Sequence, residues 1–342
     1  MKYLYLPKLL LILFSFFHFL DANEFFRSGA LADLIPFSEK KPLITGKITV
    51  LTEPIHENAR QTIQGHNGVT GSVLRGLQKL GIPMSYNPTK PEDVGEHIIV
   101  LVSIEALYQA IDLKKQGRIK TLIVGPNIMN NPSENNHLLG SAEIDCYIAP
   151  CNWARTCNIE EEPLIKRKTA IWYAGVDTNF WQPITSKTES KTMLVYWKTE
   201  PESFCIAIEE ILRAHGWQTI RLHYGHYDTK EYKNILNQVD AATFISVSES
   251  QGIALAECWA MNIPTLVWAP GTAFIYNRWI PVSSAPYLTQ ATGVFWQTVN
   301  DLNAILISYN ELKRRFAPRN WVLNYMTDES SIMLMLDIIQ SH

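Results

Sequence analysis

The sequence predicts an α/β protein made of two doubly wound domains. First, 342 residues amount to about two domains of roughly 150 residues each. Second, short apolar runs alternate with longer stretches of helical periodicity along most of the chain. Third, these apolar runs are continuous rather than alternating, which is typical of parallel strands covered by helices on both faces. Together the three observations predict βαβ units repeated in two parallel sheets.

The predicted strands form two series. The first series comprises residues 47–51, 98–103, 121–125, 144–149 and 169–174, and the second comprises 193–197, 219–224, 241–248, 265–269 and 293–296. Helices are expected between them over 69–80, 104–115, 201–215, 230–239, 253–261 and 299–316. A polar stretch near 179–190 separates the series, which gives a first domain over 47–180 and a second over 181–320. A last helix over 328–339 could pack on either domain.

The composition is that of a folded protein and argues against two classes, nucleic-acid-binding proteins with a basic surface and disulfide-rich scaffolds. Hydrophobic residues make up 46% and charged residues 18% of the chain, so it can bury a sizeable core. The net charge of −3 argues against a protein that binds nucleic acid through a diffuse basic surface. Five cysteines in so long a chain do not make a disulfide scaffold. Cys146, Cys151 and Cys157 are expected to be buried or loop thiols, although export would allow one disulfide.

The first 22 residues have the pattern of a secretory signal peptide. Lys2 and Lys8 precede an apolar run over 9–20, and Ala22 follows it. The run is shorter than the ~20 residues that span a bilayer. Because Leu20 stands where a cleavage site prefers a small residue, an uncleaved membrane anchor within 1–22 is the alternative. Residues 23–46 are expected to form an irregular lead-in.

Ligands of parallel sheets bind beyond the carboxyl ends of the strands, so the loops there are the candidate sites. The first candidate is glycine-rich, with Gly65, Gly68 and Gly71 at every third position and a helix expected to begin near Val69. Glycines and a helix N-terminus allow close approach of an anionic ligand. The spacing fits neither the dinucleotide fingerprint nor a Walker loop, and a tight turn explains it equally well.

The second candidate loop carries two carboxylates. Glu249 follows the predicted strand 241–248, and Glu257 lies about one turn into the next helix. Between them, Gln251, Gly252 and Ile253 would offer backbone amides to a phosphate. Two carboxylates on either side of an anion site suit a nucleotide sugar, which has hydroxyls at both ends and phosphates between. The alternative interpretation is an ordinary acid near a helix N-terminus together with a surface glutamate.

Other polar residues are less specific. Lys198 directly follows the predicted strand 193–197 and could reach a diphosphate, although a single lysine is more often a solvated surface charge. His223 and His226 lack a third metal ligand, so we interpret them as loop residues and expect no metal site. His66, His97 and His137 are candidate first-domain histidines, each equally compatible with a structural role.

These residues carry a resemblance. Glu249 and Glu257 form an E-x7-E pattern that continues through residues 260–267. Together with the segment 174–183, the loop around Gly68 and the tail 316–339, it resembles glycosyltransferase family 4 over roughly residues 47–340. The resemblance implies the GT-B fold, in which two Rossmann-like domains face a central cleft and a C-terminal helix, here within 321–342, crosses back to the first domain.

The resemblance also implies a reaction. A retaining glycosyltransferase would move a sugar from a nucleotide-sugar donor to a glycan or lipid-linked acceptor, without metal or other cofactor. Glu249 would contact the hydroxyls of the donor sugar and Glu257 the ribose of the nucleotide. Gly252 and Ile253 would present amides to the sugar or phosphate, and Lys198 would neutralise the diphosphate leaving group. The family usually has an arginine close to this lysine, and none stands beside Lys198.

Two other functions remain open at this point. Two α/β lobes behind a signal peptide also suit an exported solute-binding protein, against which the E-x7-E segment argues. The absent arginine would suit a catalytically degenerate GT-B protein. A nucleotide-sugar enzyme finds its donor in the cytosol, so the first 22 residues predict either membrane association facing the cytosol or, if they are cleaved, an exported protein.

Overall fold

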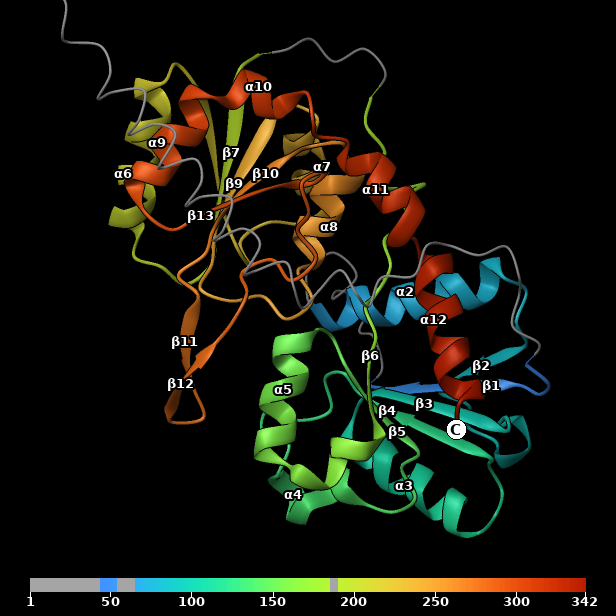
Figure 1. Cartoon of the computed structure of the whole chain (residues 1–342). Helices are drawn as coiled ribbons and strands as arrows, with labels where there is room; N and C mark the ends of the chain where they lie inside the picture. Colours follow the sequence, from blue (N-terminus) through green and yellow to red (C-terminus); the bar gives the residue numbers. More distant parts are fainter. Residues whose placement is uncertain (1–43, 54–64, 185–189) are drawn as a thin grey trace, which may run out of the picture.

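The computed structural model describes residues 44–53, 65–184 and 190–342. The predicted segment 1–22, nearly all of the lead-in and part of the predicted domain boundary lie outside these ranges. Within the ranges, two parallel sheets dominate the fold, one in each half of the molecule (Figure 1). This confirms the predicted α/β class. No helix in the described ranges combines the length and apolar character needed to cross a membrane.

The first sheet has the strand order β2-β1-β3-β4-β5-β6, with every pairing parallel. Its strands are β1 (Ile48–Thr52), β2 (Met84–Tyr86), β3 (His97–Val102), β4 (Thr121–Val124), β5 (Cys146–Ala149) and β6 (Thr169–Ile171). Ile98 and Val100 point into one core, whereas Ile99 and Leu101 point into another on the opposite face. Both faces of β3 are therefore buried, which explains its continuous apolar run.

Helices cover both faces of this sheet. They are α2 (Gly65–Lys79), α3 (Ile104–Lys115), the short α4 (Glu134–His137) and α5 (Asn152–Glu161), with 3₁₀ turns at Pro91–Asp93, Leu138–Gly140 and Pro163–Lys168. Residues of α2 share one core with the strands, and residues of α3 share the other. α5 and β2 were not predicted from the sequence.

The second sheet has the order β13-β10-β9-β7-β8 and is also parallel. Its strands are β7 (Thr192–Trp197), β8 (Gln218–His223), β9 (Ala241–Ile245), β10 (Thr265–Trp268) and β13 (Gly293–Trp296), and its helices are α6 (Glu202–Ala214), α7 (Thr229–Leu236), α8 (Ile253–Ala260), α9 (Val299–Ile307) and α10 (Tyr309–Lys313). The prediction of one helix over 299–316 was wrong, because the helix breaks at Ser308. The Ser308 hydroxyl donates to the carbonyl of Ala304 at 2.9 Å, a bond that competes with regular helix geometry.

A β-hairpin that the sequence did not predict projects from the second domain. It consists of β11 (Thr272–Ile275) and β12 (Arg278–Pro281) and reaches toward α5 of the first domain (Figure 1). Arg278 forms ion pairs with Glu160 at 2.7 Å and with Glu161 at 3.0 Å, both on α5. The hairpin therefore links the two domains on one side of the molecule.

On the other side, the chain crosses back to the first domain, as the resemblance to glycosyltransferase family 4 implied. α11 (Pro318–Tyr325) leads into α12 (Asp328–Gln340), which packs along α2 (Figure 1). The Asp328 carboxylate is fully buried and accepts hydrogen bonds from Arg75 Nε at 2.8 Å, from Arg75 Nη2 at 3.0 Å and from Lys79 at 3.3 Å. A Cβ at Gly76 would lie 2.5 Å from the Asp328 carbonyl oxygen, so only glycine permits this approach.

Candidate functional site

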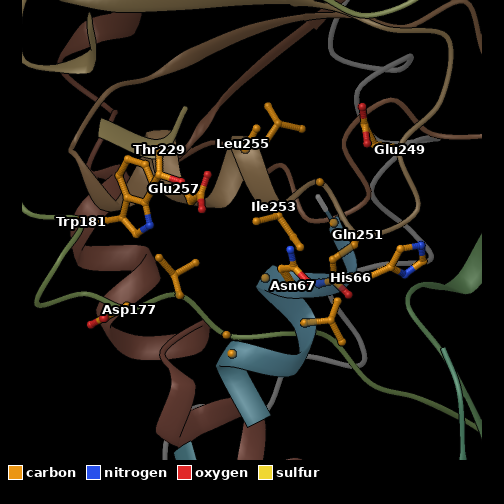
Figure 2. Close-up of a pocket in the computed structure, with 18 of the residues that line it drawn as sticks. His66, Asn67, Asp177, Trp181, Thr229, Glu249, Gln251, Ile253, Leu255 and Glu257 are labelled. Carbon is orange, nitrogen blue, oxygen red and sulfur yellow. The ribbon is translucent and has the colours of Figure 1, made fainter. Parts of the chain in front are cut away.

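A cleft of about 650 Å³ lies between the two domains. The first turns of α2 form one wall, and α8 with the loop before it forms the opposite wall (Figure 2). Every site residue predicted from the sequence lines this cleft. They are Gly68, Lys198, Glu249, Gln251, Gly252, Ile253 and Glu257.

Two helix N-termini meet at the cleft. α2 begins at Gly65, four residues earlier than expected, so Gly65, Gly68 and Gly71 lie in the helix and not in a loop before it. A Cβ at Gly68 would lie 2.9 Å from Ile253 Cδ1 at the start of α8, so Gly68 lets the two helices approach closely. Neither helix has an acidic residue in its first turn. Their partial positive charges therefore face the cleft without an internal counter-charge.

The first backbone amides of α8 have no side-chain cap and could bind an anion. Its N-cap is Gly252, which has the left-handed backbone angles φ 68° and ψ 44° and provides no side-chain cap. The first amides of a helix have no partner within the helix, and capping side chains usually satisfy some of them. Because Gly252 has no such side chain, these amides are available to a phosphate or a sugar oxygen.

Lys198 and Glu249 pair with each other across the carboxyl ends of β7 and β9. Lys198 Nζ lies 3.0 Å from Glu249 Oε1 and 3.2 Å from Oε2. The Ser246 hydroxyl donates to the same Oε1 at 3.2 Å. Lys198 Nζ lies over the ring of Tyr224, 4.7 Å from its centroid. The two residues were predicted to contact different parts of a ligand, and they neutralise each other in this structure.

The backbone of Glu249 is fixed from both domains. Its amide donates to the carbonyl of Ser283 at 2.9 Å, just beyond the hairpin. Trp153 of α5 donates its indole N–H to the carbonyl of Glu249 at 3.1 Å. The position of this carboxylate therefore depends on how the first domain packs against the second.

Glu257 has a different environment. Its Oε2 is buried without a hydrogen-bond partner, and Trp181 makes a side-chain hydrogen bond to the carboxyl group. Burial raises the pKa of Glu257 to about 8, although the charge of Arg75 and the hydrogen bond from Trp181 act in the opposite direction. Glu257 is therefore largely protonated at neutral pH, and its Oε2 has no hydrogen-bond partner among the described residues.

This raised pKa predicts how stability depends on pH. The folded protein keeps a proton on Glu257 between its ordinary value of 4.5 and about 8, whereas the unfolded chain loses it. The free energy of unfolding of the wild type should therefore fall as the pH rises through this window. Glu257→Gln removes this titration. The difference in free energy of unfolding between Glu257→Gln and the wild type should therefore shift in favour of the variant by roughly 2–4 kcal/mol from pH 5 to pH 8.5. Urea unfolding at both pH values measures this, and parallel pH profiles for the two proteins would contradict it.

Several residues of the site were not identified from the sequence. Arg75 of α2, held by Asp328, contributes positive charge near Glu257. Trp181 belongs to the segment 174–183, which carried part of the family resemblance but no predicted role in the cleft. Arg319 of α11 donates to the carbonyls of Trp181 at 2.7 Å and Ala260 at 2.6 Å, which ties that segment to the end of α8. Contacts between residues so distant in sequence leave no local pattern.

The histidines fall into two groups. His66 lines the cleft at the start of α2, whereas His97 lies against the carbonyl of Thr45 at 3.2 Å and His137 against Glu162 at 2.6 Å. His223 is the last residue of β8 and not a loop residue, and it stacks on His226 with ring centroids 4.5 Å apart. No group of three or more potential metal ligands occurs in the described ranges.

The cysteines have a structural environment. All five are buried thiols outside any disulfide, as expected for Cys146, Cys151 and Cys157. Burial raises the pKa of Cys146 to about 11 and that of Cys151 to about 12, so both remain protonated and unreactive at neutral pH.

Comparison with known proteins identifies the fold. No protein-family model and no curated protein matches the chain. Among solved structures, the catalytic domain of starch synthase IV from Arabidopsis thaliana, bound to ADP and acarbose, matches with a TM-score of 0.61 and 9% identity, over 86% of this chain and 98% of that one. Sucrose-phosphate synthase from Thermosynechococcus elongatus matches with a TM-score of 0.56 and 11% identity, over 86% and 98%.

HepE from Anabaena, in complex with UDP and glucose, matches with a TM-score of 0.54 and 11% identity, over 87% of this chain and 100% of that one. Identities this low establish the fold alone, so the chemistry must be argued from the cleft. The described chain has the GT-B fold, with two Rossmann-like domains facing one cleft.

Proposed function

We propose that this protein is a glycosyltransferase that moves a sugar from a nucleotide-sugar donor to a glycan or lipid-linked acceptor. One observation carries the proposal. A single cleft between the domains combines the uncapped N-terminus of α8, a lysine at the end of β7 and two carboxylates, Glu249 and Glu257. This arrangement offers positive partial charge for a diphosphate and a hydrogen-bonding carboxyl group on either side of it for hydroxyls.

The donor would lie along α8. Glu257 and Glu249 lie on opposite sides of Ile253 (Figure 2). The diphosphate would bind the amides of Gly252 and Ile253, with the ribose at Glu257 and the transferred sugar at Glu249. Lys198, released from its pairing with Glu249, would neutralise the departing diphosphate. Preorganised positive groups around a leaving group are usually the largest single contribution to catalysis.

We infer retention of the anomeric configuration, with the reaction on one face of the sugar and no protein nucleophile. The carboxylates among the lining residues are already engaged. Asp177 accepts from the amides of Asn179 and Phe180, and Glu257 is largely protonated. Glu249, released from Lys198 in the proposed complex, would bind the hydroxyls of the sugar instead. We also propose a metal-independent reaction, in which helix N-termini and Lys198 supply the positive charge that a cation supplies elsewhere.

The absence of an arginine beside Lys198 is the argument for a catalytically degenerate protein. In this cleft, Arg75 adds positive charge from the first domain, and the N-terminus of α2 faces that of α8. These features favour an active enzyme, and donor turnover decides between the two.

Replacing Lys198 tests the proposed function. With UDP-glucose and ADP-glucose as probes, we expect the wild type to release UDP or ADP and to bind it in calorimetry. Lys198→Gln should weaken binding of that nucleotide by ~10–100-fold, because a partly buried charge pair to the diphosphate is lost. Lys191→Gln is the matched control, since Lys191 stands at the opposite end of the same strand and bonds the carbonyl of His215 at 2.8 Å. No binding and no release with either donor would refute the proposal.

We propose membrane association through residues 1–22, with the catalytic domains facing the cytosol, or export if that segment is cleaved. The support is the apolar run over 9–20 together with the cytosolic origin of nucleotide sugars. Protease protection of a C-terminal tag in intact cells distinguishes the two, because a cytosolic tag survives and an exported one is digested.

A further inference from the structure

The side chain of Gln251 lies in the cleft without a role in the scheme above. Its Oε1 is buried and has no hydrogen-bond partner among the described residues. Native structures rarely keep a buried carbonyl oxygen unpaired, because the lost hydration is not recovered. An unpaired acceptor at a ligand cleft therefore indicates that the ligand completes it.

The donor side chains next to Glu249 are already engaged. The Glu249 carboxylate takes the hydrogen bonds of both Lys198 and Ser246. Gly252, the next residue, is fixed in the left-handed conformation at the start of α8 and has no side chain to donate. A molecule bound in the cleft can therefore supply the missing donor for Gln251 Oε1.

The chemistry of an amide oxygen narrows that molecule. Gln251 Oε1 can only accept a hydrogen bond, and a nucleotide diphosphate linked to a sugar carries no donor on its phosphate oxygens at neutral pH. A sugar carries several donors, either hydroxyl groups or the N–H of an acylamino group. The group opposite Gln251 Oε1 is therefore a hydroxyl or N–H donor, as a sugar provides, and not a phosphate oxygen.

Position distinguishes the transferred sugar from the ribose. In Figure 2, Gln251 lies on the side of Ile253 that faces His66 and Glu249, whereas Glu257 and Trp181 lie on the other side. We propose that Gln251 accepts a hydrogen bond from one donor group of the transferred sugar and so determines which sugar the enzyme selects. This inference rests on the proposed function, in which Glu249 marks the sugar end of the cleft.

A hydrogen bond to one sugar hydroxyl discriminates strongly between nucleotide sugars. A nucleotide sugar that lacks this hydroxyl leaves Gln251 Oε1 without a hydrogen-bond partner. For the wild type, one of the 2-, 3-, 4- or 6-deoxy forms of the active donor should lose ~10–100-fold in kcat/KM through this bond. For the other deoxy forms, any change in kcat/KM should be the same whether or not Gln251 is replaced.

Gln251→Met tests the inference, since it keeps the length of the side chain and removes the acceptor. We expect ~10–100-fold lower kcat/KM with the parent donor and no further loss with the one deoxy donor that Gln251 reads. The affinity for UDP or ADP alone should stay within about twofold of the wild type, which shows that the nucleotide site is intact. Gln218→Met, at an exposed position that begins β8, is the matched control and should change nothing.

Gln251→Asn provides a second variant, because it keeps the amide but shortens the side chain by one carbon. It should lower kcat/KM with the parent donor and cause no further loss with the same deoxy donor. If Gln251→Met and Gln251→Asn lose the same factor on every deoxy donor, Gln251 does not read the sugar and the inference is wrong. If the wild type neither binds UDP or ADP nor releases either from its glucose donor, the proposed function itself fails. The two failures are therefore distinguishable.

Discussion

Glu249→Gln should abolish most sugar transfer while tightening the binding of the nucleotide diphosphate. The carboxylate of Glu249 holds Lys198 at 3.0 Å, so a diphosphate must compete with it for the lysine. Removing that negative charge frees Lys198 for the phosphates, and we expect UDP or ADP to bind ~3–10-fold more tightly. The same change weakens the contacts to the sugar in the transition state, so donor turnover should fall by ~100-fold or more.

Calorimetry with UDP or ADP and steady-state release of the nucleotide measure the two effects separately. Lys198→Gln and Glu249→Gln should move nucleotide affinity in opposite directions, which a general loss of folding would not do. Ser246→Ala is the control, since it removes one neutral hydrogen bond of 3.2 Å to the same carboxylate and leaves the charge pair in place. Weaker nucleotide binding in Glu249→Gln would show that the pairing with Lys198 does not compete with the ligand.

Asp328→Ala should be the most destabilising substitution outside the apolar cores. Asp328 is fully buried at the start of α12 and accepts hydrogen bonds from Arg75 and Lys79 of α2. Breaking a buried ion pair by removing one partner typically costs ~3–5 kcal/mol. Because Arg75 and Lys79 stay partly exposed, we expect the lower end, about 3 kcal/mol, in the free energy of unfolding from urea titration.

Glu329→Ala is the matched control for this prediction. Glu329 is the next residue on the same helix, is 30% exposed and meets Lys79 only at 3.5 Å. Removing such a surface pair should cost less than about 1 kcal/mol. Equal losses for the two variants would mean that general charge in the first turn of α12, and not the buried contact with Arg75, holds the helix to α2.

Much of the fold could be predicted because burial leaves a local pattern. The core strands of both sheets are buried on both faces, and their continuous apolar runs placed β3 and β7 within one residue of their observed ends. β11 and β12 had no such pattern. Their residues alternate between exposed Phe274 or Trp279 and buried Ala273 or Ile280, and their turn requires positive φ at Tyr276 and Asn277, which are not glycines.

The start of α2 was misplaced for a related reason. Glycines disfavour a helix interior, so a glycine at every third position predicts a loop. Here Gly68 lies within the helix, and a Cβ on it would lie 2.9 Å from Ile253 Cδ1 of the other domain, a neighbour that only the assembled protein contains.

The candidate site was predictable to the extent that its residues share one loop. Glu249 through Glu257 lie within a single strand–loop–helix segment, so their joint approach to the cleft followed from local structure. Arg75 and Asp328 are 253 positions apart and meet only after α12 has crossed between the domains. The pairing of Lys198 with Glu249 also depends on tertiary structure, because it requires β7 to lie beside β9.

The return of α12 to the first domain has a consequence for biosynthesis. The core of the first domain contains Ile332, Met335 and Leu336 next to strand residues such as Ile48, so it draws on two distant parts of the chain. During translation the first sheet leaves the ribosome long before α12 does. The apolar surface that α12 will cover therefore stays exposed while the whole second domain is synthesised. The core of the second domain needs only α11, whereas that of the first domain needs α12 as well, so apolar surface of the first domain stays exposed to aggregation until the end of synthesis.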